Sequence, residues 1–248
     1  MSLPSKDLMA AVAVTRFGLG ARPGEIEAAR GDSQGWLAAQ VRHQGADLPQ
    51  DGGETSAQRF TWMRDFQEQR RMERQSKSGD AAQKSAAFMD AQRELREKTQ
   101  GDFLARAQLG ASTPVSFRER WALFWANHFT VSSTKQITSV LVGPFEREAI
   151  RPHVFGRFED LLTASSTHPA MLTYLDQAQS VGPDSPAMAR RKQGRRGLNE
   201  NLAREILELH TVGVDAGYTQ ADVTEFARAL TGFSIGRDSE PQVGQFVF

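Results

Sequence analysis

Hydrophobic residues recur at helical spacing in residues 199–232, and this spacing predicts two helices joined by a glycine-containing turn. The apolar stripe of the first helix consists of Leu202, Ile206 and Leu209. Asn199 and His210 fall inside that stripe, within roughly 20° of each other on a helical wheel. Because burying an unpaired amide or imidazole costs about 1–3 kcal/mol, both side chains need partners. The pattern therefore predicts a helix that carries polar groups into the core.

A second helix with an inward histidine is predicted from Ser116 onward. Glu119 follows Ser116 at the spacing of a capping box, which marks a helix start. The aromatic residues that share one face of this helix are Phe117, Trp121, Phe124, Trp125 and Phe129. His128 lies in the middle of that aromatic face. We therefore expect His128 to face the interior as well.

Residues 55–111 are rich in Gln, Arg, Glu, Lys and Ala and contain few β-branched residues. They predict two long helices, at residues 56–75 and 81–109, separated by a break at residues 76–80. An antiparallel hairpin with both charge signs on its solvated face accounts for this composition. The alternative is that the hairpin binds a partner helix or a polyanion.

The predicted fold class is all-α, with an orthogonal or bundle-like core of several helices and a long charged hairpin that projects from it. Thr219 and Asp222 match a capping box at the start of the last helix. Only residues 242–248 alternate like a strand. Residues 1–248 form either one helical domain or the N-terminal part of a larger one, and the apolar final residues favour the second alternative.

Composition narrows the chemistry that this chain can carry. It contains no cysteine, which excludes disulfides, thiolate metal ligands and thiol nucleophiles. The 30 basic and 30 acidic side chains balance, so the chain has no specific signal for nucleic acid. No apolar run approaches the roughly 20 residues of a membrane span.

The short apolar run near the N-terminus has two interpretations. It contains Asp7 and is followed by Arg16, so it fits an amphipathic helix better than a signal peptide. A cytoplasmic location is therefore favoured over export.

A basic loop is predicted at residues 177–198. Five cations occupy seven consecutive positions, at Arg190, Arg191, Lys192, Arg195 and Arg196. The loop is either a solvated connection or a lid that attracts an anionic ligand, for which Arg195 and Arg196 are candidate contacts.

Five segments of the chain resemble successive blocks of one bacterial family. They are RFGLGARPGE (16–25), WANHF (125–129), HPAMLTYLD (168–176), NENLAREILELHTVGV (199–214) and GYTQADVTEFARALTGF (217–233). The family is the uncharacterised domain of unknown function 1800. The resemblance implies a mostly helical protein without an established activity, usually continued by a second helical half and exported in some members. Family members commonly have Asp-Asn after the third block's Tyr-Leu, whereas Asp176 is followed here by Gln177.

The candidate catalytic residues are His128, Asp176 and His210. The same three residues are candidate metal ligands, because two neutral imidazoles and one carboxylate suit Zn, Fe(II) or Mn. A divalent metal with an open coordination position would activate water for hydrolysis. Without a metal, His210 would be a general base oriented by Asp176 or Glu205.

Asn199, Asn201 and Glu205 are candidate ligand-binding residues at the start of the same helix. Glu205 and His210 are about 140° apart on that helix, so they cannot bind one ion together. The structural alternative makes Asn199 a helix cap, Glu205 a surface charge and each histidine a core residue with one hydrogen-bond partner. The chain has no HExxH, GxSxG or P-loop motif, which disfavours the corresponding hydrolase and nucleotide chemistries.

Two functional hypotheses follow. The first, slightly favoured, is a non-enzymatic interaction or scaffold protein that contacts a protein partner through the 55–111 hairpin. It predicts histidines that lie apart or are sealed from solvent. The second is a hydrolase, metal-assisted or acid–base, with a buried pocket of His, Asp and Asn. It predicts that His128, Asp176 and His210 converge beside a cleft.

Overall fold

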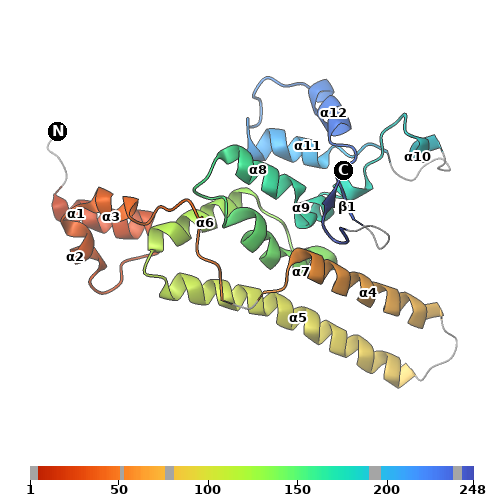
Figure 1. Ribbon diagram of the computed structural model, residues 1–248, viewed down its shortest axis with the longest axis horizontal. Coiled ribbons are helices and arrows are strands. Elements are labelled where there is room, and N and C mark those ends of the chain that lie inside the picture. The colour runs from red at the N-terminus through yellow and green to blue at the C-terminus, as the bar shows by residue number, and fades with distance from the viewer. Residues whose placement is uncertain (1–4, 51–52, 76–80, 190–196, 237–241) are drawn as a thin grey trace.

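The computed structural model describes residues 5–50, 53–75, 81–189, 197–236 and 242–248. Within these ranges the chain is helical apart from a two-stranded antiparallel sheet, which confirms the all-α prediction (Figure 1). The helices before the core are α1 (Lys6–Val12), α2 (Glu25–Arg30), α3 (Ser33–Ala38), α4 (Ser56–Gln75) and α5 (Ala81–Ser112). Those that follow are α6 (Ser116–His128), α7 (Gln136–Phe145), α8 (Phe158–Thr167), α9 (Pro169–Tyr174), α10 (Pro186–Ala189), α11 (Asn201–Glu205) and α12 (Gln220–Ala229).

Several helices continue into turns of a different pitch. The π-helical turns η1 (Ala13–Phe17), η2 (Glu146–Ile150) and η4 (Ile206–His210) extend α1, α7 and α11, and η3 (Gln177–Gln179) is a 3-10 turn. The sheet pairs β1 (Ser234–Ile235) with β2 (Phe246–Val247), so the strand predicted at residues 242–248 is present in part. Thr219 and Asp222 form the predicted capping box of α12.

The main core lies where α6, α7, α9, α11 and α12 meet. Its buried side chains include Phe129, Leu141, Leu172, Leu202 and Ala227. The helices α1 to α3 form a separate small cluster of Ala10, Val14 and Ala29 at one end of the molecule (Figure 1). None of the helices in the described part of the chain is long and apolar enough to cross a membrane.

The hairpin of α4 and α5 projects beyond the core, with the two helices side by side (Figure 1). Helix α4 has the predicted bounds, and α5 runs three residues past its predicted end at 109. The predicted break at residues 76–80 lies outside the described residues.

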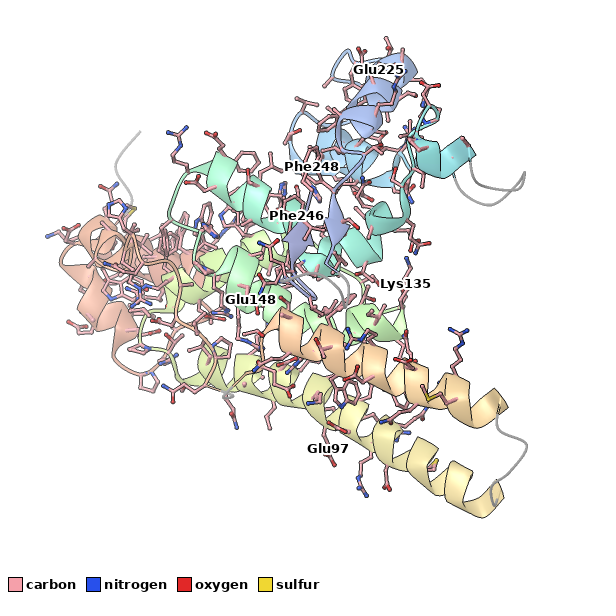
Figure 2. All side chains as sticks on the ribbon, turned by 45° about the vertical axis from the view of Figure 1, so that its right-hand side comes forward. Glu97, Lys135, Glu148, Glu225, Phe246 and Phe248 are labelled. Carbon is pink, nitrogen blue, oxygen red and sulfur yellow. The ribbon has the colours of Figure 1, made fainter. Side chains whose placement is uncertain are left out.

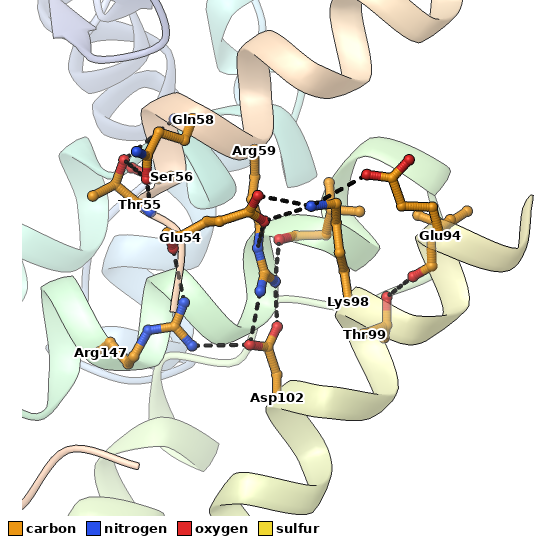
Figure 3. A network of polar contacts seen from close by, with 12 residues as sticks. Glu54, Thr55, Ser56, Gln58, Arg59, Glu94, Lys98, Thr99, Asp102 and Arg147 are labelled. Carbon is orange, nitrogen blue, oxygen red and sulfur yellow. Dashed lines mark hydrogen bonds and ion pairs between the residues drawn. The ribbon is translucent and has the colours of Figure 1, made fainter. Parts of the chain in front are cut away.

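Buried ion pairs attach the base of the hairpin to α7 and η2 (Figure 3). The Arg59 guanidinium of α4 binds the Asp102 carboxylate of α5 with two nitrogens, and its Nη1 also donates to the Val140 carbonyl at 3.0 Å. Arg147 Nη1 reaches the same Asp102 carboxylate at 2.9 Å. One buried carboxylate therefore joins both hairpin helices to the core.

A second buried network centres on Arg151, which is 0% exposed. Its guanidinium binds Glu119 of α6 at 2.8 Å and Glu146 of η2 at 2.6 Å. The Arg106 side chain of α5 also contacts Glu146, at 3.2 Å. This network therefore holds α5, α6 and η2 together.

The predicted capping box at the start of α6 is wrong. Glu119 points inward to Arg151, because a buried arginine needs a carboxylate partner more than a solvent-facing helix end does. Ser116 is the first helical residue, and its hydroxyl has no hydrogen-bond partner among the described residues. The free N–H of Phe117 is instead satisfied by Gln40 Oε1 at 2.9 Å.

Candidate functional site

His128 and His210 lie together at the meeting point of α6 and η4, with ring centroids 6.0 Å apart. His128 Nε2 lies 3.0 Å from the His210 carbonyl oxygen. Because a carbonyl only accepts, this geometry assigns the proton of neutral His128 to Nε2. Both imidazoles pack against the Phe129 ring, at 4.7 and 4.9 Å between centroids.

The surroundings of His210 keep it neutral. The residue is 4% exposed, and among the described residues its Nδ1 has no hydrogen-bond partner. Burial, followed by the neighbouring His128, lowers the pKa of His210 to about 4. At neutral pH the site therefore holds an uncharged imidazole with one unsatisfied nitrogen.

The π-helical turn η4 decides where His210 points. A π turn inserts extra backbone into a helix, so positions beyond it rotate away from the regular wheel. The Thr211 hydroxyl donates to the Ile206 carbonyl at 2.6 Å and helps to close this turn. Helical periodicity alone does not predict this π-helical turn.

Asp176 does not join the two histidines. Its carboxylate pairs with Lys135 Nζ at 2.7 Å, just beyond the C-terminal end of α9, where its backbone adopts a left-handed φ of 57°. Within the described ranges, no group of three His, Asp or Glu side chains could hold a metal ion. The predicted ligand set of His128, His210 and Asp176 is therefore not assembled.

The cluster around Asp176 closes the end of α9. Lys135 Nζ donates to the carbonyls of Thr173 at 3.2 Å and Tyr174 at 2.9 Å. A positive charge there complements both the unpaired carbonyls and the helix dipole.

Asn199 and Asn201 complete the same helix end. Asn199 Nδ2 donates to the Leu175 carbonyl at 2.8 Å, and Asn201 Nδ2 approaches it at 3.4 Å. Asn199 Oδ1 also accepts from the Asn201 backbone N–H at 2.9 Å, which orders the entry into α11. Sequence reasoning identified these amides but missed that their partner is the end of another helix.

Glu205 lies apart from this cluster and is half-buried. Burial, and then the nearby Glu208 carboxylate, raise the pKa of Glu205. Its neighbour Arg204 instead forms the surface ion pairs, with Glu200 and Glu208 at 3.1 Å each. Arg195 and Arg196 lie outside the described residues.

Sequence reasoning missed a partly buried polar cluster made by Ser56, Glu148 and His168. The Glu148 carboxylate accepts from the Ser56 backbone and hydroxyl at 2.7 Å each and from His168 Nε2 at 3.0 Å. His168 Nδ1 accepts from the Ala170 N–H at 3.1 Å, so the proton of neutral His168 is on Nε2. Burial opposes ionisation, but hydrogen bonds from His168 and Ser56 outweigh it and lower the pKa of Glu148. The sequence signal was His168 directly before Pro169, a helix start whose cap had to be polar.

Comparison with known families matches residues 12–248 to the family described as "Protein of unknown function (DUF1800)". The chain belongs to this family. No curated protein and no solved structure matches it.

The geometry of this DUF1800 chain divides the candidate site into two places. His128 and His210 meet beside Phe129, whereas Asp176, Asn199 and Asn201 gather at the end of α9. The second group forms hydrogen bonds that a helix end requires. Of these two groups, only the histidine pair retains a buried nitrogen without a partner among the described residues, at His210 Nδ1.

Proposed function

We propose that the protein is a non-enzymatic interaction protein whose α4/α5 hairpin is the arm that binds a protein partner. The observation that carries this proposal is the buried attachment of the hairpin base through Arg59, Asp102 and Arg147 (Figure 3). A fixed arm loses less conformational freedom on binding than a flexible one, which favours recognition.

The outer surface of the hairpin has the composition of a contact surface. Met72 on α4 and Met89 on α5 are 59% and 57% exposed. Methionine is adaptable and recurs at surfaces that accept partners. Charged residues follow Met89 along α5, among them Asp90, Arg93, Glu94 and Glu97, and Figure 2 shows Glu97 directed away from the core.

Site-specific photocrosslinking in cells tests this proposal. Met72 and Met89 are each replaced by a photoreactive phenylalanine analogue, and exposed Glu225 of α12 serves as the matched control position (Figure 2). We expect the same discrete cross-linked protein from both hairpin positions and none from position 225. Equal labelling at all three positions, or none at the hairpin, would contradict the proposal.

One observation favours a second candidate function, a hydrolase. His210, which lies beside His128, has a buried Nδ1 without a partner among the described residues, as a general base or a metal ligand would. The test is the metal content of the purified protein beside a His128→Ala/His210→Ala double variant. Stoichiometric Zn, Fe or Mn that is lost in a still-helical variant would support the hydrolase. Metal-free proteins with a much lower melting temperature in the variant would make both histidines structural.

A further inference from the structure

A large hollow in the described part of the structure lies away from both histidines. It has a volume of about 930 Å³ and lies between residues 42–50, the C-terminal end of α5 and the first turn of α6. Pockets that hold small ligands commonly have volumes of about 300–1,000 Å³. Its size is therefore suitable for a small organic molecule.

Two arginines line this hollow and converge on one carboxylate. Arg42 Nη2 contacts Asp47 Oδ1 at 2.6 Å, and Arg118 Nη1 contacts Asp47 Oδ2 at 3.2 Å. Among the described residues of the lining, Asp47 is the only acidic one beside two arginines, so these residues leave one net positive charge. The Asp47 carboxylate also demonstrates which ligand chemistry fits between these guanidinium groups.

Each guanidinium keeps one terminal nitrogen without a partner among the described residues. Arg118 is 9% exposed, and its Nε is held by the Gln40 carbonyl at 2.7 Å, which leaves Nη2 unpaired. Arg42 Nε is held by the Gly45 carbonyl at 2.8 Å, which leaves Nη1 unpaired. Arg118 is buried and the Arg42 side chain is 37% exposed. An arginine with a spare donor is suited to a carboxylate, which it binds through charge-assisted hydrogen bonds.

The segment that carries Arg42 and Asp47 is held in place before any ligand arrives. The Ala46 N–H donates to the Arg151 carbonyl at 2.8 Å, and Arg151 Nη1 donates to the Asp47 carbonyl at 2.6 Å. Gly45 has a φ of +82° and packs so closely on Arg151 that a Cβ would overlap its carbonyl oxygen. These contacts pre-organise the two charged groups.

The rest of the lining combines six apolar residues, Ala46, Leu48, Ala105, Leu109, Pro114 and Val115, with five uncharged polar ones, Gln44, Gln50, Gln108, Ser112 and Thr113. We propose that this hollow binds a monocarboxylate with an apolar body, through Arg42 and Arg118. A single negative charge matches the net charge of the lining, whereas a phosphate dianion exceeds it. Both a free carboxylic acid and the C-terminus of an apolar peptide have this chemistry.

Calorimetric titration with octanoate tests the proposal, with octanamide as the uncharged probe of similar size. We expect saturable one-site binding of octanoate and none of octanamide. Arg42→Gln should weaken octanoate binding about tenfold, because it removes a charge-assisted hydrogen bond. Arg157→Gln, which changes an exposed arginine paired with Glu159, is the matched control and should leave binding unchanged.

Asp47→Asn separates a binding role from a structural one. It removes the internal carboxylate and raises the net charge of the hollow to two, so octanoate should bind several-fold more tightly. A purely structural ion pair would predict unchanged or weaker binding. An apolar tripeptide with a free C-terminus, compared with its amide, identifies which source of carboxylate binds more tightly.

Three outcomes would overturn the proposal. They are octanoate binding that never saturates, equal binding of octanamide, and affinities that do not change in Arg42→Gln and Asp47→Asn. Circular dichroism confirms that each variant is folded, and Asp47→Asn remains decisive if Arg42→Gln unfolds. The hollow is lined by the C-terminal end of α5 but not by Met72 or Met89, so failure of these measurements leaves the crosslinking test of the proposed function unaffected.

Discussion

At the scale of single residues, Gly143 shows how an absent side chain permits a buried ion pair. Gly143 lies inside α7, and a Cβ built there would overlap the Asp102 carboxylate. That carboxylate is the group that Arg59 and Arg147 share. The glycine therefore allows α5 to approach α7 closely enough for the network to form.

We predict that Gly143→Ala destabilises the protein by roughly 2–4 kcal/mol, because it displaces a buried charge from its partners. Gly101→Ala is the matched control in α5, where an added Cβ meets nothing within 4 Å. The control should stabilise the protein by roughly 0.5–1 kcal/mol through helix propensity. Urea denaturation measures both changes, and the same sign for the two variants would refute this role of Gly143.

His210 makes the stability of the protein depend on pH. Burial and His128 lower its pKa in the folded protein to about 4, whereas the ordinary value is 6.5. The unfolded chain therefore binds a proton more readily than the folded chain between these two values. The stability that this group contributes is complete above pH 6.5 and is lost as the pH falls to 4.

We predict that the free energy of unfolding drops by up to roughly 3 kcal/mol between pH 6.5 and 4 because of His210. The His210→Asn variant should lose this part of the pH dependence, and denaturation at a series of pH values measures it. His43→Asn, at an exposed position, should retain the wild-type slope. An unchanged slope in His210→Asn would show that the imidazole titrates equally in both states.

At the scale of elements, contacts at the base of the hairpin, rather than the length of its helices, orient it relative to the core. Contacts between α4 and α7 and between α5 and α7 join both helices to the core. Arg59 is central, since it binds Asp102 of α5 and the Val140 carbonyl of α7. Removing it leaves a buried carboxylate with one partner fewer.

We predict that Arg59→Met lowers stability by about 3–5 kcal/mol and lets the hairpin change its angle to the core. Because the chain has no cysteine, spin labels at Met72→Cys and Glu225→Cys attach only where intended. Pulsed electron paramagnetic resonance should give a narrow distance distribution in the parent protein and a broad one in Arg59→Met. Arg64→Met, which removes a surface pair with Asp65, should keep the narrow distribution. A narrow distribution in Arg59→Met would mean that other contacts orient the arm.

At the scale of the whole molecule, the hydrophobic residues form two clusters of very different size. The main core spans α6 to α12 and receives Met63 and Phe66 from the hairpin. The N-terminal cluster has only Ala10, Val14 and Ala29 as fully buried members. So small a cluster contributes little hydrophobic free energy, and its stability depends on polar links to α6.

We predict that the two clusters unfold at different urea concentrations. Variants that keep one tryptophan and replace the others by phenylalanine report separately on the N-terminal cluster (Trp36), the hairpin (Trp62) and the core (Trp125). The Trp62 and Trp125 transitions should coincide, because buried networks join hairpin and core. The Trp36 transition should come first. Three coincident transitions would show that the N-terminal helices belong to the same cooperative unit.

Local patterns were sufficient for the elements of this fold but not for its polar partners. The bounds of α4 and the Thr219 cap follow from neighbours three or four residues apart, and both agree with the structure. Glu119 satisfies the same local rule for a cap yet binds Arg151, 32 residues away. Helical periodicity does not predict that a residue so distant in sequence binds Glu119 in place of the helix start.

The same distinction between local pattern and distant partner applies to the candidate site. Helical spacing placed Asn199 and His210 on an inward stripe. It did not predict the hydrogen bond from Asn199 to the Leu175 carbonyl or the ion pair between Asp176 and Lys135. The π turn that ends at His210 also departs from the regular helical wheel. Residue type and spacing thus predicted which groups need partners.

By itself, the sequence determined the helical class, the long charged hairpin, the absence of thiol chemistry and the presence of polar side chains on apolar faces. These properties depend on composition and on neighbours within one or two helical turns. Only the tertiary structure decided which polar groups meet, because most of their partners come from other elements. In the tertiary structure His128 contacts His210, and Asp176 forms an ion pair with Lys135. Arg42 and Arg118 line the same hollow. A buried charge must be paired wherever the fold places it, so the choice of partner belongs to the packing of the whole chain.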